Sequence, residues 1–247
     1  MKIKVFFLIA LFVTTVFAVN AQDKNIQGTW KLIDERAAEA GDTNIKIINS
    51  THFMWVWYHS DGKPFRAGSG TQTAKDGKYT ETITVNAMPL LIGAQAICTY
   101  EIVEDGKKMI SRGYIEKEGV KLIEINEVYE KVEVLETNAP EVQDTWKLID
   151  VLRAAAGITH IKVINSNHFM FVTYTSDGKP TNVGYGTQTT KDGKYIETIV
   201  GNAMSMLVGA QAIYDYKVVG KDMTISGRIE KEGVKLMEFN EAYEKFE

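Results

Sequence analysis

Two glutamates, Glu81 and Glu197, are the side chains of this sequence that best suit acid–base chemistry or recognition of a polar group. Each alternates with tyrosine and isoleucine along a β-rich segment, so it shares a strand face with apolar side chains. A carboxylate there is costly unless paired, and its pKa rises. Candidate partners are His52 and His168, at matching positions, and Arg66, which has no counterpart. Such a pair can orient a ligand or transfer a proton, whereas an outward-facing glutamate would make only a cross-strand contact.

A second candidate feature is an aromatic segment in which Phe53, Trp55 and Trp57 alternate and therefore share one strand face. The matching segment later in the chain keeps Phe169 and Phe171 but ends in a threonine. The opposite face of both segments is apolar too, which indicates that both faces are covered. The aromatic face could line a cavity that holds a flat apolar ligand. Alternatively, it belongs to an ordinary core or to a contact between domains.

Other chemistries find little support. No histidine or carboxylate cluster has metal-ligand spacing, so we expect no metal and no cofactor. Cys98 is the single cysteine and a tyrosine stands at the matching position, which favours a buried, inert thiol. Gly68-Ser69-Gly70 precedes no helix, so its glycines are expected to mark a bend or bulge rather than a phosphate site. His59 and His160 lack histidine counterparts and are expected on the surface.

These candidates occur in pairs because the chain is a tandem duplication. The segment Thr29–Asp34 returns as Thr145–Asp150, and the spacing of 116 positions holds as far as Val103 and Val219. Roughly two positions in three are identical over this stretch, far beyond chance. A two-residue deletion follows in the second copy, as a surface hairpin tolerates. Each copy must therefore be a complete folding unit.

The first 21 residues predict a signal peptide. Basic residues precede the apolar run Val5–Val19, and small residues follow up to Ala21. The protein is thus expected to be periplasmic or secreted after cleavage near Ala21, without membrane insertion, and to comprise domains 22–132 and 143–247 joined by a linker at 133–142. Cleavage lowers the basic count from 28 to 26 against 32 acidic residues, a net charge near −6. That charge argues against a nucleic-acid partner.

Within each copy the pattern is strand, turn, strand. Aspartate–glycine or glutamate–glycine pairs separate alternating segments, as tight hairpins require. The strands predicted in the first copy are Trp30–Asp34, Ile45–Asn49, His52–His59, Phe65–Thr73, Tyr79–Val85, Ile97–Val103, Lys108–Ile115 and Val120–Lys131. Residues 35–41 are an exception, and so are residues 86–95, which suggest an apolar helical turn or a lid. Because closure removes exposed edges, we predict an all-β protein with two tandem eight-stranded antiparallel barrels.

Several motifs carry a family resemblance across both copies: Gly28-Thr29-Trp30, the segment Thr51–Tyr58, Asp61-Gly62-Lys63, Gly70-Thr71, Tyr79–Ile83 and the closing Val128–Val132. With them, each copy resembles the small bacterial lipocalin-like (calycin-type) domains of unknown function. The resemblance implies a hydrophobic small-molecule site at the open end of each barrel. It also implies that the tryptophan plugs the closed end beneath a basic residue of the last strand, for which Lys131 and Lys245 are available.

Three functions are compatible with these features. The preferred one is a non-enzymatic exported protein that binds a small hydrophobic or amphipathic molecule, with one potential pocket per barrel. Its predicted ligand-binding residues are Phe53, Trp55, Trp57, His52, Glu81, Phe169, Phe171, His168 and Glu197. The alternative is a module with filled barrels that binds protein or glycan at its surface. A barrel isomerase or lyase that uses a Glu81–His52 pair is the third.

Overall fold

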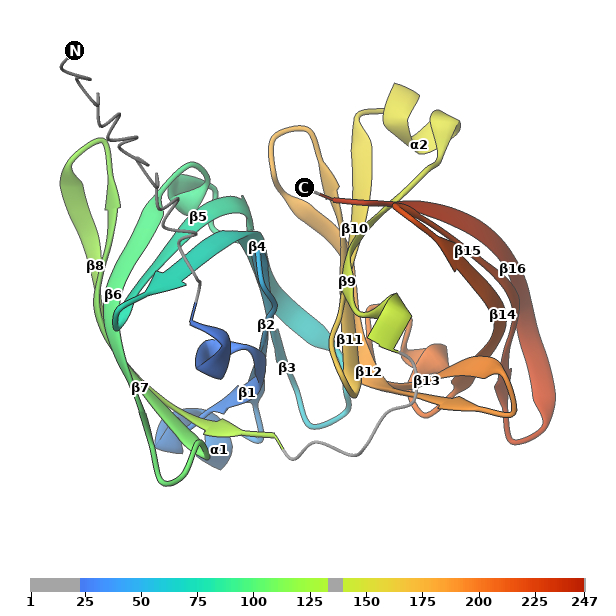
Figure 1. The fold of residues 1–247 in the computed structure, drawn as a ribbon, viewed down its shortest axis with the longest axis horizontal. Coiled ribbons are helices and arrows are strands. Elements are labelled where there is room, and N and C mark those ends of the chain that lie inside the picture. Colours follow the sequence, from blue (N-terminus) through green and yellow to red (C-terminus); the bar gives the residue numbers. More distant parts are fainter. Residues whose placement is uncertain (1–22, 133–139, 247) are drawn as a thin grey trace, which may run out of the picture.

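The computed structural model describes residues 23–132 and 140–246, and within them it confirms two closed, eight-stranded antiparallel barrels (Figure 1). The predicted signal peptide and residues 133–139 of the predicted linker lie outside the described residues. The first barrel comprises β1 (Gly28–Leu32), β2 (Thr43–Ile48), β3 (His52–Tyr58), β4 (Pro64–Lys75), β5 (Lys78–Asn86), β6 (Gln95–Val103), β7 (Lys108–Lys117) and β8 (Val120–Lys131).

The second barrel repeats this order. It comprises β9 (Asp144–Leu148), β10 (Ile158–Ile164), β11 (His168–Thr175), β12 (Pro180–Lys191), β13 (Lys194–Asn202), β14 (Gln211–Val219), β15 (Asp222–Lys231) and β16 (Val234–Lys245). Each strand pairs with its neighbours in sequence, and the first pairs with the last: Trp30 lies opposite Lys131, and Trp146 opposite Lys245. Closure leaves neither sheet with an exposed edge.

Turn chemistry explains why these segments fold back so tightly. Asp76 and Gly77 both have positive φ angles, 51° and 72°, and the matching Asp192 and Gly193 repeat them at 53° and 72°. Two consecutive positive φ values suit the twist of a two-residue hairpin. The glycines of Gly68-Ser69-Gly70 also behave as predicted, since the register of β4 against β5 shifts between Ser69 and Gly70.

Helices are short and lie at the ends of the barrels. α1 (Glu35–Glu39) and α2 (Val151–Ala155) follow the first strand of their barrels, and Asp34 and Asp150 cap them by accepting bonds from backbone N–H groups. Four 3₁₀ turns complete the described elements: η1 (Lys24–Ile26), η2 (Pro89–Leu91), η3 (Pro140–Val142) and η4 (Ser205–Leu207). In Figure 1, α1 and α2 lie at opposite ends of the molecule. Among the described residues, no helix is long and apolar enough to cross a membrane.

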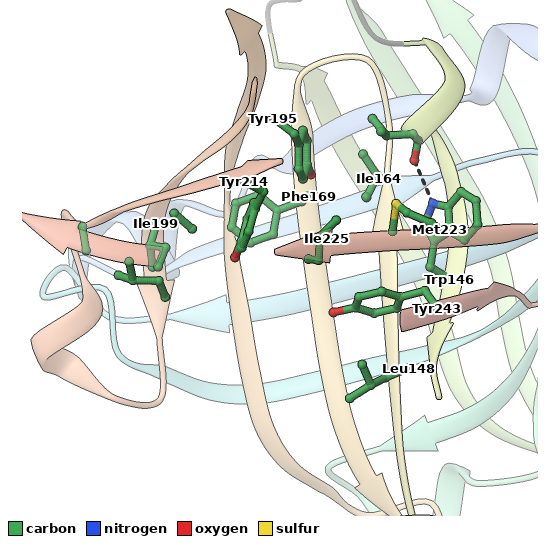
Figure 2. Close-up of a cluster of buried hydrophobic side chains, with 14 of the residues drawn as sticks. Trp146, Leu148, Ile164, Phe169, Tyr195, Ile199, Tyr214, Met223, Ile225 and Tyr243 are labelled. Carbon is green, nitrogen blue, oxygen red and sulfur yellow. Dashed lines mark hydrogen bonds between the residues drawn. The ribbon is translucent and has the colours of Figure 1, made fainter. Parts of the chain in front are cut away.

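Each barrel has a fully buried tryptophan on its first strand, bonded to the 3₁₀ turn before it. Trp30 and Trp146 are fully buried, and each Nε1–H donates to a carbonyl of the preceding 3₁₀ turn, that of Ile26 at 2.8 Å and that of Val142 at 2.7 Å. The Nζ atoms of Lys131 and Lys245 lie 5.1 and 5.8 Å from the indole centroids. Figure 2 shows Trp146 among the side chains that fill the second barrel.

A third core lies between the barrels. The outward face of β3, with Met54 and Val56, packs against the outward face of β11, with Met170 and Val172. The aromatic strand is therefore apolar on both faces because one face meets the partner barrel and the other faces its own lumen. The buried members of this interface core are Ile45, Ile47, Met54, Val56, Ala67, Val85, Ile161, Val163, Met170, Val172, Val183 and Tyr185.

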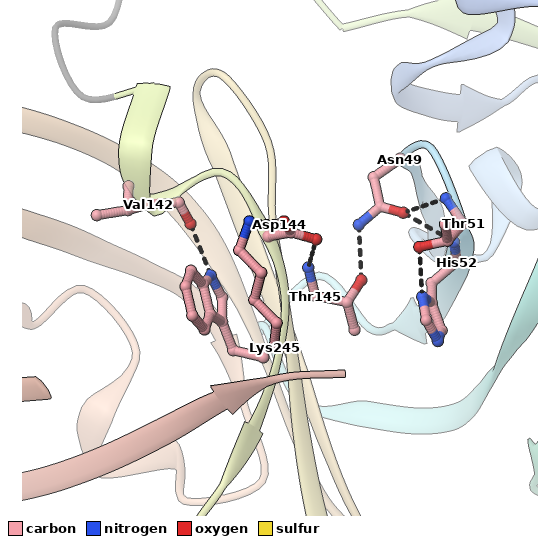
Figure 3. Close-up of polar contacts among 8 residues, drawn as sticks. Asn49, Thr51, His52, Val142, Asp144, Thr145 and Lys245 are labelled. Atoms are coloured by element: carbon pink, nitrogen blue, oxygen red, sulfur yellow. Dashed lines mark hydrogen bonds and ion pairs between the residues drawn. The ribbon is translucent and has the colours of Figure 1, made fainter. Parts of the chain in front are cut away.

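The contact between the barrels has pseudo-twofold symmetry. Asn49 Nδ2 donates to Thr145 Oγ1 at 2.6 Å (Figure 3), and the matching Asn165 Nδ2 donates to Thr29 Oγ1 at 2.7 Å. Two backbone bonds of 3.1 Å are reciprocal in the same way, Asn86 N–H to the Gly178 carbonyl and Asn202 N–H to the Gly62 carbonyl. Equivalent residues thus exchange places across the interface, as in an isologous dimer.

The turn glycine of this contact has no substitute. Gly62 has a φ of +79°, and a Cβ there would lie 2.6 Å from the Val200 carbonyl oxygen of the other barrel. Both the backbone conformation and the close approach therefore require glycine.

Candidate functional site

The two predicted glutamates point inward, each paired with a lysine that the sequence reasoning missed. Glu197 on β13 is 3% exposed and forms an ion pair with Lys162 of β10, while Tyr195 O–H donates to Glu197 Oε1 at 2.7 Å. Three rings lie within 5.0–6.0 Å of Lys162 Nζ: those of Phe169, Tyr195 and Tyr214 (Figure 2 shows the rings). The buried cation is therefore surrounded by a carboxylate and aromatic faces.

The first barrel has the same arrangement. Glu81 is 6% exposed, pairs with Lys46 and accepts a 2.5 Å hydrogen bond from the hydroxyl of Tyr79. Burial lowers the pKa of Lys46, but the charges of Glu81 and Glu127 outweigh burial and raise it overall. A lysine that stays charged in this way is a poor nucleophile, so the pair is suited to ion pairing rather than to covalent catalysis.

A second carboxyl group lines each lumen from the last strand. Tyr243 O–H donates to Glu241 Oε2 at 2.7 Å, and Tyr129 O–H donates to Glu127 Oε2 at the same distance. Burial, and then the neighbouring glutamate charge, raises the pKa of Tyr243 and of Tyr129 well above the usual value. Among the described residues, each barrel thus contains one buried lysine and two carboxyl groups. Tyrosine hydroxyls donate to the carboxyl groups, and tyrosine rings lie near the lysine.

The proposed histidine partners lie elsewhere, so the prediction of Glu81–His52 and Glu197–His168 pairs is wrong. His52 faces the contact between the barrels, where its ring lies 5.2 Å from that of Phe246 and its Nδ1 is bonded to Thr51 (Figure 3). His168 stacks on Tyr185 in the same region. The alternation of β3 and β11 explains this, because each histidine shares its face with the interface methionine and valine, not with the phenylalanine.

The second barrel encloses a cavity of about 220 Å³. Lys162, Glu197 and Glu241 line it together with the rings of Phe169, Phe171 and Phe239. Aliphatic side chains supply much of the remaining wall: Ile199, Leu207, Ile229 and Met237. The predicted residues Phe169, Phe171 and Glu197 therefore meet around one space, which is apolar apart from its charged residues and a few polar groups.

The end of this cavity next to α2 is lined by polar side chains. Arg153 of α2 lies there, paired with Asp150 at 3.2 Å, and His160 stacks on Phe171 with ring centroids 5.0 Å apart. The expectation that His160 is a surface residue is wrong, because it lines the cavity and bonds Thr173 Oγ1 at 2.9 Å through Nδ1. Burial, with the charges of Lys162 and Arg153, lowers the pKa of His160 to about 3, so the ring is neutral at pH 7.

The matching positions of the first barrel carry bulkier aromatic side chains. Trp55 and Trp57 stand where the second barrel has Phe171 and Thr173, and Trp55 packs on the first barrel's core. A Cβ on Gly68 would lie 2.5 Å from the Trp55 ring, so the glycine gives that ring its place. Phe53 is fully buried in the same core.

Two further predictions concern residues outside the lumen network. His59 is on the surface as expected, with its Nδ1 atom 2.7 Å from Asp42 Oδ1, and Cys98 is a buried free thiol as expected. Arg66 is exposed and makes no pair with Glu81. Within the described residues, no group of three or more histidine, cysteine, aspartate and glutamate side chains could hold a metal ion.

Comparison with known proteins gives a family likeness for the first copy. Residues 25–141 match a domain of unknown function, DUF4488. No curated protein matches the chain in sequence.

Among solved structures, a protein of unknown function from the DUF3598 family of Nostoc punctiforme is 9% identical, with 90% of this chain and 96% of that chain covered and a TM-score of 0.23. A DNA polymerase sliding clamp from Pseudomonas aeruginosa is 6% identical, covers 92% and 59% of the two chains, and has a TM-score of 0.14. A Helicobacter pylori β clamp in complex with 5-chloroisatin is 10% identical, covers 88% and 55%, and has a TM-score of 0.13. Likenesses this weak carry no argument about function.

Proposed function

We propose that this chain is a non-enzymatic binding protein whose second barrel holds one small, mainly apolar molecule. The observation that carries the proposal is the cavity of about 220 Å³ walled by phenylalanine rings and aliphatic side chains. A dry apolar cavity of roughly 150 Å³ holds benzene, so this space suits a compact ring compound with a short substituent. Burial of the ligand's apolar surface would supply most of the affinity.

The polar lining favours binding over catalysis. Lys162 and Glu197 satisfy each other, and the neutral His160 is bonded to a threonine. The isomerase or lyase hypothesis relied on a glutamate–histidine pair that neither barrel forms. The lining would instead orient a ligand, with Phe169 and Phe171 against its ring.

The proposal assigns the working pocket to the second barrel alone. In the first, Trp55 packs on the core, and Trp55 and Trp57 are both larger than Phe171 and Thr173, which stand at their positions in the second. One ligand per chain is therefore expected, although the lumen networks are the same.

Calorimetry with a neutral probe, 2-phenylethanol, tests both parts. The variant Phe171→Trp/Thr173→Trp transfers the first barrel's side chains into the second and should abolish binding. Its matched control, Trp55→Phe/Trp57→Thr, should bind as the wild type does at the original site. If the tryptophan variant binds normally, or neither it nor the wild type binds, the proposed pocket is wrong. Native mass spectrometry of the same samples would report the number of ligands per chain.

We also propose that the chain is exported and that each barrel is lipocalin-like. The basic start, the short apolar run and the small residues before Gln22 support export. The buried tryptophan of each barrel, with a lysine ammonium group near its ring, supports the lipocalin-like assignment. N-terminal sequencing of protein recovered outside the cytoplasm should begin at Gln22, and recovery of an uncleaved cytoplasmic chain would refute export.

A further inference from the structure

The charged side chains that line the cavity of the second barrel differ in their pairing, and the one without an ion-pair partner among the described residues indicates the class of ligand. Lys162 is the lysine of the lumen network, and its ion pair with Glu197 is buried, with side chains 5% and 4% exposed. Arg153 at the cavity's end is already paired with Asp150. Glu241 also lines the cavity, and within the described residues it has the Tyr243 hydroxyl as its bonded partner and forms no ion pair.

We propose that Glu241 is the anchor for the ammonium group of a small aromatic amine. The inference rests on the proposed function and deepens it by naming the ligand's charge. Arg153 and Lys162 line the cavity with Glu197 and Glu241, but the two cations are paired with Asp150 and Glu197, so among the described residues Glu241 is the lining charge with no ion-pair partner. Glu241 is partly buried, so its carboxylate has lost part of its hydration, and Tyr243 O–H satisfies one of its oxygens. A ligand ammonium group supplies both the missing cation and up to three donors.

The surrounding side chains suit this cation as well as its apolar body. Tyr243 and Phe239 belong to the same strand as Glu241, and Phe171, with His160 stacked on it, also lines the cavity. Aromatic faces stabilise a desolvated cation, as the ring of Phe169 does for Lys162. His160 adds no competing positive charge, because its pKa of about 3 leaves it neutral at pH 7.

Titration calorimetry at pH 7 with 2-phenylethylamine, 2-phenylethanol and phenylacetate tests the inference, because the three probes share a phenyl ring and differ in charge. The amine should bind about 10- to 100-fold more tightly than the alcohol, as a charge-assisted bond predicts. Glu241→Gln should reduce the amine's affinity to that of the alcohol and leave the alcohol's unchanged, which also shows that the variant is folded. Glu127→Gln, the matched change in the first barrel, should leave all three affinities unchanged.

The outcomes separate the two proposals. Equal affinities for amine and alcohol, or tightest binding of phenylacetate, would overturn the ammonium assignment while the binding function stands. Loss of the amine preference in Glu127→Gln rather than Glu241→Gln would place the site in the wrong barrel and overturn it as well. If none of the three probes binds, the proposed function fails and the assignment fails with it.

Discussion

The ion pair Lys46–Glu81 provides the sharpest test of how the lumen network stabilises a barrel. Replacing Lys46 with methionine keeps most of the side-chain length but leaves Glu81 buried with the Tyr79 hydroxyl as its remaining bonded partner. Removing one partner of a buried pair costs about 3–5 kcal/mol, because the other charge remains desolvated. Both side chains of this pair are 8% exposed, so solvent does little to reduce that cost. We therefore expect Lys46→Met to lower the free energy of unfolding by about 3–5 kcal/mol.

An exposed pair of the same barrel is the matched control. Lys31 and Glu130 lie 3.4 Å apart with side chains 47% and 49% exposed, and such pairs contribute roughly 0–1 kcal/mol. Lys31→Met should therefore change the unfolding free energy by no more than about 1 kcal/mol.

The double variant Lys46→Met/Glu81→Met distinguishes the loss of the whole ion pair from the cost of leaving one charge buried without its partner. It removes both buried charges and leaves the Tyr79 hydroxyl without its acceptor, which costs about 1–3 kcal/mol. It should therefore be more stable than either single variant. Urea unfolding followed by circular dichroism, with slopes compared between variants, gives the free energies. The reasoning is refuted if Lys46→Met costs no more than Lys31→Met, or if the double variant loses the sum of the single losses.

Three further predictions concern pH and the contact between the barrels. Stability should fall as pH rises above about 10, because five buried tyrosines titrate at about 10 when unfolded and have raised pKa values when folded. Each tyrosine contributes up to about 1.4 kcal/mol of lost stability per pH unit. Urea unfolding measures this loss, and tyrosinate absorbance reports the ionisation. Stability should also fall from pH 6.5 towards pH 4, by about 3 kcal/mol through His168, because burial lowers its folded pKa to about 4. In urea unfolding, His168→Phe should remove this part of the loss and leave the part due to His160, whose pKa is also lowered. A protease site placed within residues 133–139 and then cut should leave the two barrels together in size-exclusion chromatography, whereas Val172→Asp should separate them after the cut. Separation of the unmodified halves would show that the reciprocal contacts are too weak to hold the barrels.

The sequence predicts the fold well because its strongest signals are local. Strand alternation and the glycine turns depend on neighbouring residues, and the duplication doubles each observation. The same alternation makes Glu81 and Glu197 candidates for the lumen but leaves open whether their strand face points inward or outward. The partner of each glutamate does not follow from local pattern. Lys46 and Lys162 lie on strands that are distant in sequence from their glutamates, and no local signal determines which two strands face each other across a barrel.

Lys46 is also hidden by its own pattern. It alternates with Ile45 and Ile47, which ordinarily indicates that the isoleucines face the core and the lysine faces solvent. The outward face of β2 is instead covered by the second barrel, so the isoleucines belong to the interface and the lysine to the lumen. The signal available from sequence was repetition, since Lys46 recurs as Lys162 in the second copy, just as Glu81 recurs as Glu197.

The positions that are identical between the two copies and the positions that differ therefore have different physical explanations. Deep in the lumen, the loss of Lys162 or Glu197 alone would leave a buried charge, so stability by itself resists change there. At the positions of Phe171 and Thr173 a substitution leaves no buried charge, and the copies differ there: the first barrel has Trp55 and Trp57. Under the proposed function, the residues that set the second barrel apart are thus ones that differ between the copies, and Glu241 is the carboxyl group that a ligand there would meet. Swapping the divergent pair should exchange the binding behaviour of the barrels without altering the lumen network.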